Sequence, residues 1–295
     1  MTRPVEVIGP RLLRRMPLPS YDAGADKDER GKLLVVAGSA QLPGGAILPA
    51  SAALRVGCGT VRVAVPSEIA TAVGVAVPEL MVVPLPSSRS GRAAIEAVGS
   101  QLDACAAVVL GPGMLGEPGV DELIAWLIEH APCPTLVDAR ALYVWAERRS
   151  WELAGPRVVT PHAREIAAML DRERDQVEAD RRAVATAFAR EHGVTVVLKG
   201  VETLIADRAG ELFLSRRGTR GLGTAGSGDV LAGVIGGLLA QGLGPTEAAV
   251  WGVYLHALAG EAVARDLGED GMIATDLLCR LPIVLRALRS RTGHS

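Results

Sequence analysis

Short runs of valine and leucine recur along most of this chain, and a segment with helical spacing separates many of them. The first run is "KLLVVAG" at 32–38, and the last uniform one is "VTVVLKG" at 194–200. Strands that are apolar at every position are typical of a parallel sheet buried on both faces, because helices connect and cover such strands. This rhythm predicts an α/β fold in which a mostly parallel central sheet lies between helical layers.

The remaining runs complete the predicted domain. Further strands are expected at 60–66, 80–85, 106–111, 134–138 and 157–161. Segments 203–207 and 211–215 are close enough to form a hairpin. Three helical stretches follow at 230–242, 245–268 and 275–290, with Pro245 as a helix start and Thr275 as a cap. No linker interrupts the pattern, so we expect one domain over 27–295, preceded by an N-terminal arm over 1–26 that could instead form a short leading helix.

Charge and composition argue against two classes of partner. The net charge is −2 and aromatic residues make up 3% of the chain, so neither a basic field nor base-stacking residues favour nucleic acid. The basic N-terminus is not followed by an apolar signal-peptide core, and no uninterrupted apolar stretch is long enough for a membrane span. We therefore expect a cytoplasmic protein without a membrane partner.

The stretch "GLGTAGSGDV" at 221–230 is the clearest candidate site. Glycines allow backbone N–H groups to turn inward, and the start of the following helix adds the positive end of its dipole. Such a loop can hold a phosphate, but the carboxylate of Asp229 would repel a bound anion. A general base that takes a proton from an attacking hydroxyl explains this placement. The alternative is that Asp229 only stabilises the helix start electrostatically.

A dinucleotide-binding fingerprint is a weaker interpretation of a second glycine-rich loop. Gly111, Gly113 and Gly116 fit GxGxxG after a strand, and Asp138 stands where a ribose-binding acid would follow. Pro118 and Gly119 fall where the helix should already be under way, and this unit lies in the middle of the chain. Both facts argue against a Rossmann domain.

Two more strand ends carry polar residues. His162 and Glu165 are spaced to share one face of a helical turn, where they could touch a substrate, a magnesium-bound water or each other. Lys199 ends another strand and suits a phosphate. A solvated surface pair and a surface lysine are the respective alternatives. We expect His162 and Lys199 on opposite sides of Asp229.

In this order the segments resemble the ADP-dependent NAD(P)H-hydrate dehydratases of the ribokinase-like superfamily. The resemblance covers nearly everything from Lys27 onward. Its marks are "VVAGS", "AALRVGCGTVRVAVP", "LGPGM", "VDARAL", "VTPHAREIAAML", "VVLKGVETLIA" and "TAGSGDVLAGVIGGLLAQG". It implies a ribokinase-like three-layer αβα sandwich and a repair reaction, in which ADP is used to dehydrate (S)-NAD(P)H-hydrate to NAD(P)H with release of AMP and phosphate.

The resemblance also implies roles for individual residues. Asp229 matches the catalytic carboxylate, and Glu165 matches an acid that helps to hold Mg²⁺ through water. The anion hole would comprise Gly226, Ser227 and Gly228. The hydrated cofactor would contact Ala46, Gly113 or Gly116, His162 and Asp229. The nucleotide, ADP or AMP, would contact Lys199, Gly200, Val201, Glu202, Thr203 and Gly228.

Some details depart from the family pattern or stay open. Asp26-Lys27-Asp28 replaces a common His-Lys-Gly-like lead-in, and Arg140 stands where a small or acidic residue is commoner. An epimerase domain often fused to this one is not seen, so a separate epimerase is expected as a partner, and family likeness suggests a homotetramer. The rival function is a ribokinase-like kinase for a sugar or vitamin-precursor alcohol. A nucleotide sensor with a dead site is a third possibility, which an intact Asp229 argues against.

Overall fold

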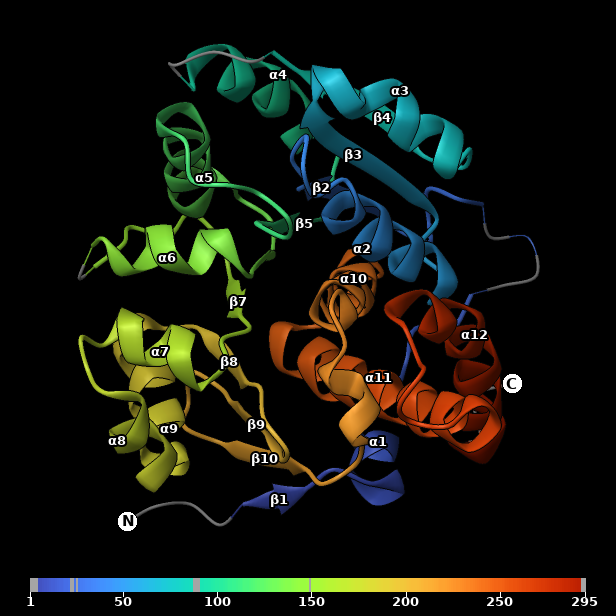
Figure 1. The fold of residues 1–295 in the computed structure, drawn as a ribbon. Coiled ribbons are helices and arrows are strands. Elements are labelled where there is room, and N and C mark those ends of the chain that lie inside the picture. The colour runs from blue at the N-terminus through green and yellow to red at the C-terminus, as the bar shows by residue number, and fades with distance from the viewer. Residues whose placement is uncertain (1–4, 22–23, 25, 87–90, 149, 293–295) are drawn as a thin grey trace.

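Ten strands form a single sheet within the part of the chain that the computed structural model describes, residues 5–21, 24, 26–86, 91–148 and 150–292. Their order across the sheet is β1-β10-β9-β8-β7-β6-β5-β2-β3-β4 (Figure 1). The strands are β1 (Glu6–Val7), β2 (Lys32–Val36), β3 (Thr60–Pro66), β4 (Met81–Leu85), β5 (Ala107–Leu110), β6 (Thr135–Val137), β7 (Arg157–Val159), β8 (Thr195–Leu198), β9 (Thr203–Ala206) and β10 (Leu212–Ser215).

The sheet is parallel except at β9, which pairs antiparallel with both β8 and β10. The predicted hairpin is therefore confirmed as β9–β10. The predicted strands from 32–38 to 194–200 are present as β2 to β8; β3 has the predicted bounds, and the others are shorter by one to three residues. All seven run in the same direction, so their carboxyl ends meet at one edge of the sheet.

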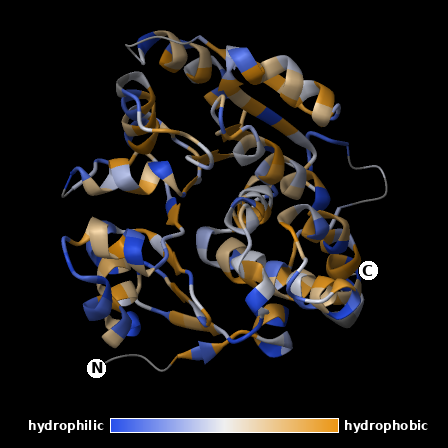
Figure 2. Cartoon of the chain, viewed as in Figure 1, coloured by the Kyte–Doolittle hydropathy of each residue, from blue (hydrophilic) through white to orange (hydrophobic). Residues whose placement is uncertain are grey.

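Helices cover both faces of the sheet, which confirms the three-layer αβα sandwich. On β2, Leu33 and Val35 pack into one core, and Leu34 and Val36 pack into the other. Figure 2 shows hydrophilic colours gathering on the outer helices α8 and α9. The first core holds α1 (Pro10–Arg15), α2 (Gly44–Arg55), α3 (Ser67–Ala76), α10 (Ser227–Ala240), α11 (Pro245–Leu267) and α12 (Ala274–Thr292). The second holds α4 (Arg92–Leu102), α5 (Pro118–His130), α6 (Arg140–Ala146), α7 (Ala163–Met169), α8 (Arg174–Ala179) and α9 (Arg181–His192).

Helix α10 packs against both α2 and the sheet, and two glycines permit this close packing. A Cβ atom on Gly236 would lie 2.2 Å from Cγ2 of Val109 on β5, and one on Gly233 would lie 2.1 Å from the carbonyl oxygen of Pro49 on α2. No side chain fits at either distance. The glycines therefore fix how deeply α10 sits, and with it the position of the helix start that carries Asp229.

A buried arginine closes the end of α5. The side chain of Arg157, on β7, is 1% exposed and donates hydrogen bonds to the carbonyl oxygens of Ile128 (2.7 Å) and Ala131 (2.9 Å), among others. Burial lowers the pKa of this guanidinium to about 10. Because the last carbonyls of a helix have no intrahelical donor, Arg157 satisfies groups that would otherwise be buried without partners.

The N-terminal segment contains the short helix α1, which confirms the alternative of a leading helix over a plain arm within 1–26. It also contains β1, which composition did not indicate and which pairs in parallel with β10. Residues 1–4, 22–23 and 25 lie outside the described residues. Pro245 begins α11 as predicted. The assignment of Thr275 as a cap is wrong, because α12 already begins at Ala274, and the side chain of Asp276 accepts a hydrogen bond from the Ile273 amide (2.8 Å) instead. None of the described helices is long and apolar enough to cross a membrane.

Candidate active site

The direction of chain travel reverses between β2 and β5, which are neighbours in the sheet. From β2 the chain moves outward to β3 and β4, whereas from β5 it moves the other way through β6, β7 and β8. Ligands of open α/β sheets bind outside the carboxyl ends of the strands at such a reversal. The polar strand ends found in the sequence all lie along this edge.

The loops after β2 and β5 touch each other at the reversal. The amide of Gly38 donates to the carbonyl of Pro112 (2.7 Å), and a Cβ on Gly45 would lie only 2.4 Å from Cα of Gly113. This contact brings Ala46, the residue after Gly45, beside Gly113. Gly116 lies apart from it, where a Cβ would meet the guanidinium of Arg140 at 2.8 Å.

The start of α10 provides the candidate anion site. Gly226 precedes the helix with a φ of +83°, a left-handed conformation that side chains disfavour. Ser227, Gly228 and Asp229 form the first turn. The first four N–H groups of a helix lack intrahelical acceptors. The Ser227 amide donates to the carbonyl of Thr224 (3.3 Å), so the amides of Gly228 and Asp229 are better candidates for an anion than that of Ser227.

A buried histidine contacts the first turn of α10 on the side that faces the core. Nε2 of His256, on α11, lies 3.1 Å from Oγ of Ser227 and 3.0 Å from its carbonyl oxygen. Burial lowers the pKa of His256 to about 4, so the imidazole is neutral at pH 7. The pair gives Ser227 a buried partner on the side facing the core, which orients the turn.

Lys199 links the end of β8 to this turn. Its Nζ lies 2.9 Å from Oδ1 of Asp138 and 3.8 Å from Oε2 of Glu165, and a Cβ on Gly228 would lie 3.8 Å from the same nitrogen. The surface-lysine alternative is therefore wrong. Burial opposes protonation, but the carboxylates of Asp138, Glu165 and Asp229 outweigh it and raise the pKa of Lys199.

The same surroundings bring the pKa of Asp229 close to neutral pH. Burial raises the pKa of Asp229 to about 7, the negative charge of Asp138 adds to the rise, and Lys199 opposes it. A carboxylate with a pKa close to the working pH suits general base catalysis. Asp138 is the functional candidate that sequence reasoning missed, since it was considered only as a ribose-binding acid of a different fold.

His162 and Glu165 contact each other. The Glu165 side chain accepts from the His162 amide (2.7 Å) and the His162 ring accepts from the Glu165 amide (3.1 Å), which together make a capping box for α7. The solvated-pair alternative is wrong for Glu165, which is 7% exposed. Burial raises the pKa of Glu165 despite the opposing charge of Lys199. His162 is half exposed toward solvent.

One expected placement needs correction. His162 and Lys199 form a parallel β-bridge, so they are direct backbone neighbours and do not flank Asp229 from opposite sides. The segments after β7 and β8 converge because these strands are adjacent in the sheet. No group of three histidine, cysteine or acidic side chains arranged for a metal occurs among the described residues.

The predicted nucleotide segment forms the turn between β8 and β9. Nη2 of Arg181 lies within 3.3 Å of the carbonyl oxygens of Leu198, Lys199 and Glu202, which fixes the turn from outside. Val201 is fully exposed at its tip, an unusual place for an apolar side chain. Gly200 and Thr203 lie beside it, and Thr203 begins β9.

Comparisons with known proteins agree with one another. A family model described as NAD(P)H-hydrate dehydratase matches residues 33–283. An ADP-dependent (S)-NAD(P)H-hydrate dehydratase from Xanthomonas campestris pv. campestris is 38% identical over 98% of this chain and 99% of that protein. A bifunctional NAD(P)H-hydrate repair enzyme from Moorella thermoacetica is 39% identical over 93% of this chain, which spans 53% of that protein. The ADP/ATP-dependent NAD(P)H-hydrate dehydratase of Bacillus subtilis, co-crystallized with ATP/Mg²⁺, has a similar structure with a TM-score of 0.84. The two sequences are 27% identical, and the match covers 96% of this chain and 99% of that one.

Proposed function

The chain belongs to the NAD(P)H-hydrate dehydratase family, and from this premise we propose that it dehydrates (S)-NAD(P)H-hydrate with ADP as co-substrate, releasing NAD(P)H, AMP and phosphate. One observation of the structure carries the proposal. Asp229 stands at the start of α10 with a pKa raised to about 7, beside helix amides that can hold a phosphoryl group. A base and an anion site in contact are what phosphoryl transfer to a hydroxyl requires.

The chemistry proceeds in two stages. Asp229 takes the proton of the ring hydroxyl as its oxygen attacks the β-phosphorus of ADP, and the bond from that phosphorus to the bridging oxygen breaks to release AMP. The new phosphate ester is a good leaving group. The lone pair of the ring nitrogen expels it as phosphate, and loss of a proton from the neighbouring ring carbon restores the carbon–carbon double bond. The released phosphate or a water molecule takes that proton, so the elimination needs no second protein base.

We place ADP at the β8–β9 side of Asp229. Lys199 and Gly228 are within reach of one another, so one phosphate group can contact both, and exposed Val201 offers an apolar surface to the base. Gly200, Glu202 and Thr203 complete this segment. The hydrated ring is placed between Asp229 and the loops that bring Ala46 and Gly113 together, with His162 at its solvent side; Gly116 is the less favoured contact.

Mg²⁺ is proposed to arrive with the nucleotide phosphates. The described residues provide no ready-made cage, which suits an ion that keeps several waters and binds mainly through substrate phosphates. The buried carboxylate of Glu165, 3.8 Å from the ammonium of Lys199, would reach such an ion only through water.

The setting of the reaction is a further part of the proposal. We propose a cytoplasmic homotetramer that acts on hydrates interconverted by a separate epimerase. The bifunctional relative supports only the pairing of this reaction with a second repair activity, because this chain spans 53% of that protein. The alternative, a kinase for a sugar or vitamin-precursor alcohol, is weaker because the full-length match at 38% identity is a dehydratase.

The proposal is tested by following products of hydrated NADH, ADP and Mg²⁺. Absorbance of the reduced nicotinamide should rise, and phosphorus NMR should show AMP and inorganic phosphate in amounts equal to NADH. ATP in place of ADP tests the nucleotide preference. A phosphate ester of a sugar or vitamin-precursor alcohol that persists, with no gain in NADH absorbance, would instead identify the kinase.

A further inference from the structure

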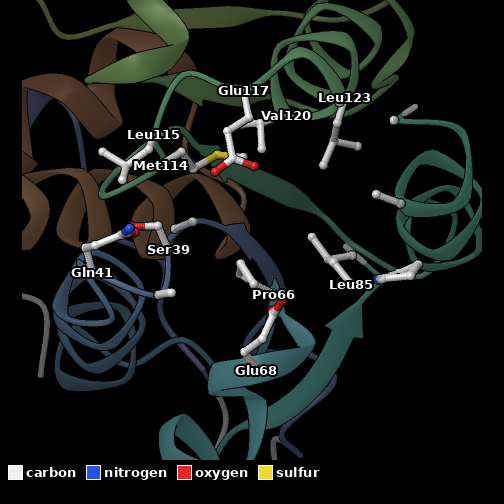
Figure 3. Close-up of a pocket in the computed structure, with 17 residues that line it drawn as sticks. Ser39, Gln41, Pro66, Glu68, Leu85, Met114, Leu115, Glu117, Val120 and Leu123 are labelled. Atoms are coloured by element: carbon white, nitrogen blue, oxygen red, sulfur yellow. The ribbon is translucent and has the colours of Figure 1, made fainter. Parts of the chain in front are cut away.

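A cavity of about 170 Å³ lies at the carboxyl ends of β2, β3 and β4, away from the proposed ADP segment. Figure 3 shows it between the loop after β2, the first turns of α3 and α5, and the end of β4. Leu85, Met114, Val120 and Leu123 give it apolar walls. Glu68 and Glu117 line it from opposite sides (Figure 3).

The cavity adjoins the region assigned to the hydrated ring. Gly38 lines the cavity, and a Cβ on Gly38 would lie 3.1 Å from Cβ of Ala46. Met114, another lining residue, follows Gly113 directly. On α2, two residues beyond Ala46, Leu48 meets the turn before Asp229, since a Cβ on Gly226 would lie 2.5 Å from its Cδ1. The start of α2 therefore separates Asp229 on one side from the cavity on the other.

We propose that this cavity holds the adenosine half of the hydrated dinucleotide, an inference that rests on the proposed function. With ADP on the β8–β9 side of Asp229, a substrate that continues past its reacting ring is directed toward β2, β3 and β4. The apolar walls suit the faces of a purine ring, and the hydroxyl of Ser39 and amide of Gln41 provide polar partners at the rim.

The acidic residues determine which dinucleotide fits better. Among the described lining residues, Glu68 and Glu117 are the ionisable ones. Carboxylates accept hydrogen bonds from ribose hydroxyls, whereas a 2′-phosphate calls for a basic side chain. The described part of the lining therefore favours hydrated NADH over hydrated NADPH.

The decisive experiment compares a dinucleotide with its truncated form. Hydrated NADH and hydrated reduced nicotinamide mononucleotide present the same ring, but the second lacks adenosine. Val120→Trp fills the cavity, and Val75→Trp places the same side chain at an exposed position of α3 as a matched control. We expect Val120→Trp to lower kcat/KM about tenfold or more for hydrated NADH and less than about twofold for the mononucleotide hydrate. Val75→Trp should change neither.

Equal losses on both substrates, or no loss on either, would overturn the inference. Equal kcat/KM values of the wild-type protein for hydrated NADH and for the mononucleotide hydrate would overturn it as well. Failure of the proposed function looks different, because the wild type would then produce no NADH from hydrated NADH and ADP.

A second variant decides the matter if Val120→Trp does not fold. Glu117→Gln removes one charge without adding volume, and should raise the ratio of kcat/KM for hydrated NADPH over hydrated NADH about fivefold. An unchanged ratio would refute the acidic recognition of the ribose.

Discussion

Asp229→Asn should abolish turnover and at the same time make the protein more stable above neutral pH. The pKa of this carboxyl rises from 3.8 to about 7 on folding, chiefly through burial. A group whose folded pKa lies above its unfolded value binds more protons in the folded state. Its charged form therefore opposes folding fully above pH 7, and the penalty disappears as the pH falls toward 3.8.

The size of the effect follows from this difference. About three pKa units correspond to about 4 kcal/mol as an upper value. Residual solvent access at the site and the favourable helix start reduce this to about 2 kcal/mol. For a chain of 295 residues, that energy corresponds to a rise in Tm of about 3 °C. The loss of a general base lowers the rate by about 10²–10⁴-fold.

Thermal unfolding without nucleotide, at pH 8.5 and pH 5, measures the effect. The gain in Tm for Asp229→Asn should shrink to about 1 °C at pH 5, because most of the penalty has gone there. Asp175→Asn is the matched control, since Asp175 is an exposed acid in the first turn of α8. It should change stability by less than about 0.5 kcal/mol. An Asp229→Asn protein that is no more stable than wild type at pH 8.5 would refute the argument.

Three further perturbations probe the surroundings of the site. Lys199→Met removes a proposed phosphate contact, so calorimetry should show weaker ADP binding. It also removes the cation that opposes the rise in the pKa of Asp229, so the acid limb of the pH–rate profile should move to higher pH, and an unmoved limb would contradict this coupling. His256→Leu leaves Oγ of Ser227 buried without its partner, and the free energy of unfolding in urea should fall by about 1–3 kcal/mol. The variant should also lower kcat more than it raises the KM for ADP, and His256→Asn should partly restore kcat. Arg157→Met should cost about 3 kcal/mol in the same unfolding assay while kcat per folded molecule stays unchanged, because the partners of Arg157 are backbone carbonyls at and near the end of α5. A fall in kcat would place it in the site.

Strands and their common edge were predictable because burial on both faces imposes a uniform composition. Val35 and Val36 look alike in sequence because each faces a separate apolar core. The α10 start was predictable for a local reason too, since glycines followed by an acid and an apolar helix occupy one short segment. Features that depend on residues close in sequence can therefore be predicted from the sequence.

Pairings between distant residues were not predictable. The contact of Asp138 with Lys199 exists because β6, β7 and β8 are adjacent and parallel, and nothing local to either residue reports that order. The role of His256 depends on how α11 crosses α10, and its apolar neighbours suggest only a buried helix. Strand β1 was missed because two residues carry no periodic signal.

The pairing of β1 with β10 has a consequence for synthesis on the ribosome. Glu6 pairs with Phe213, so the strand made first adds to an edge that is made roughly 200 residues later. At about 5–20 residues per second, that wait lasts roughly 10–40 seconds. During that interval the apolar side chains of α1 that later fill the core, Leu12 and Leu13, have no α11 or α12 to pack against. A nascent chain arrested before residue 213 should therefore bind holdase chaperones through its first twenty residues and release them once α11 and α12 have emerged.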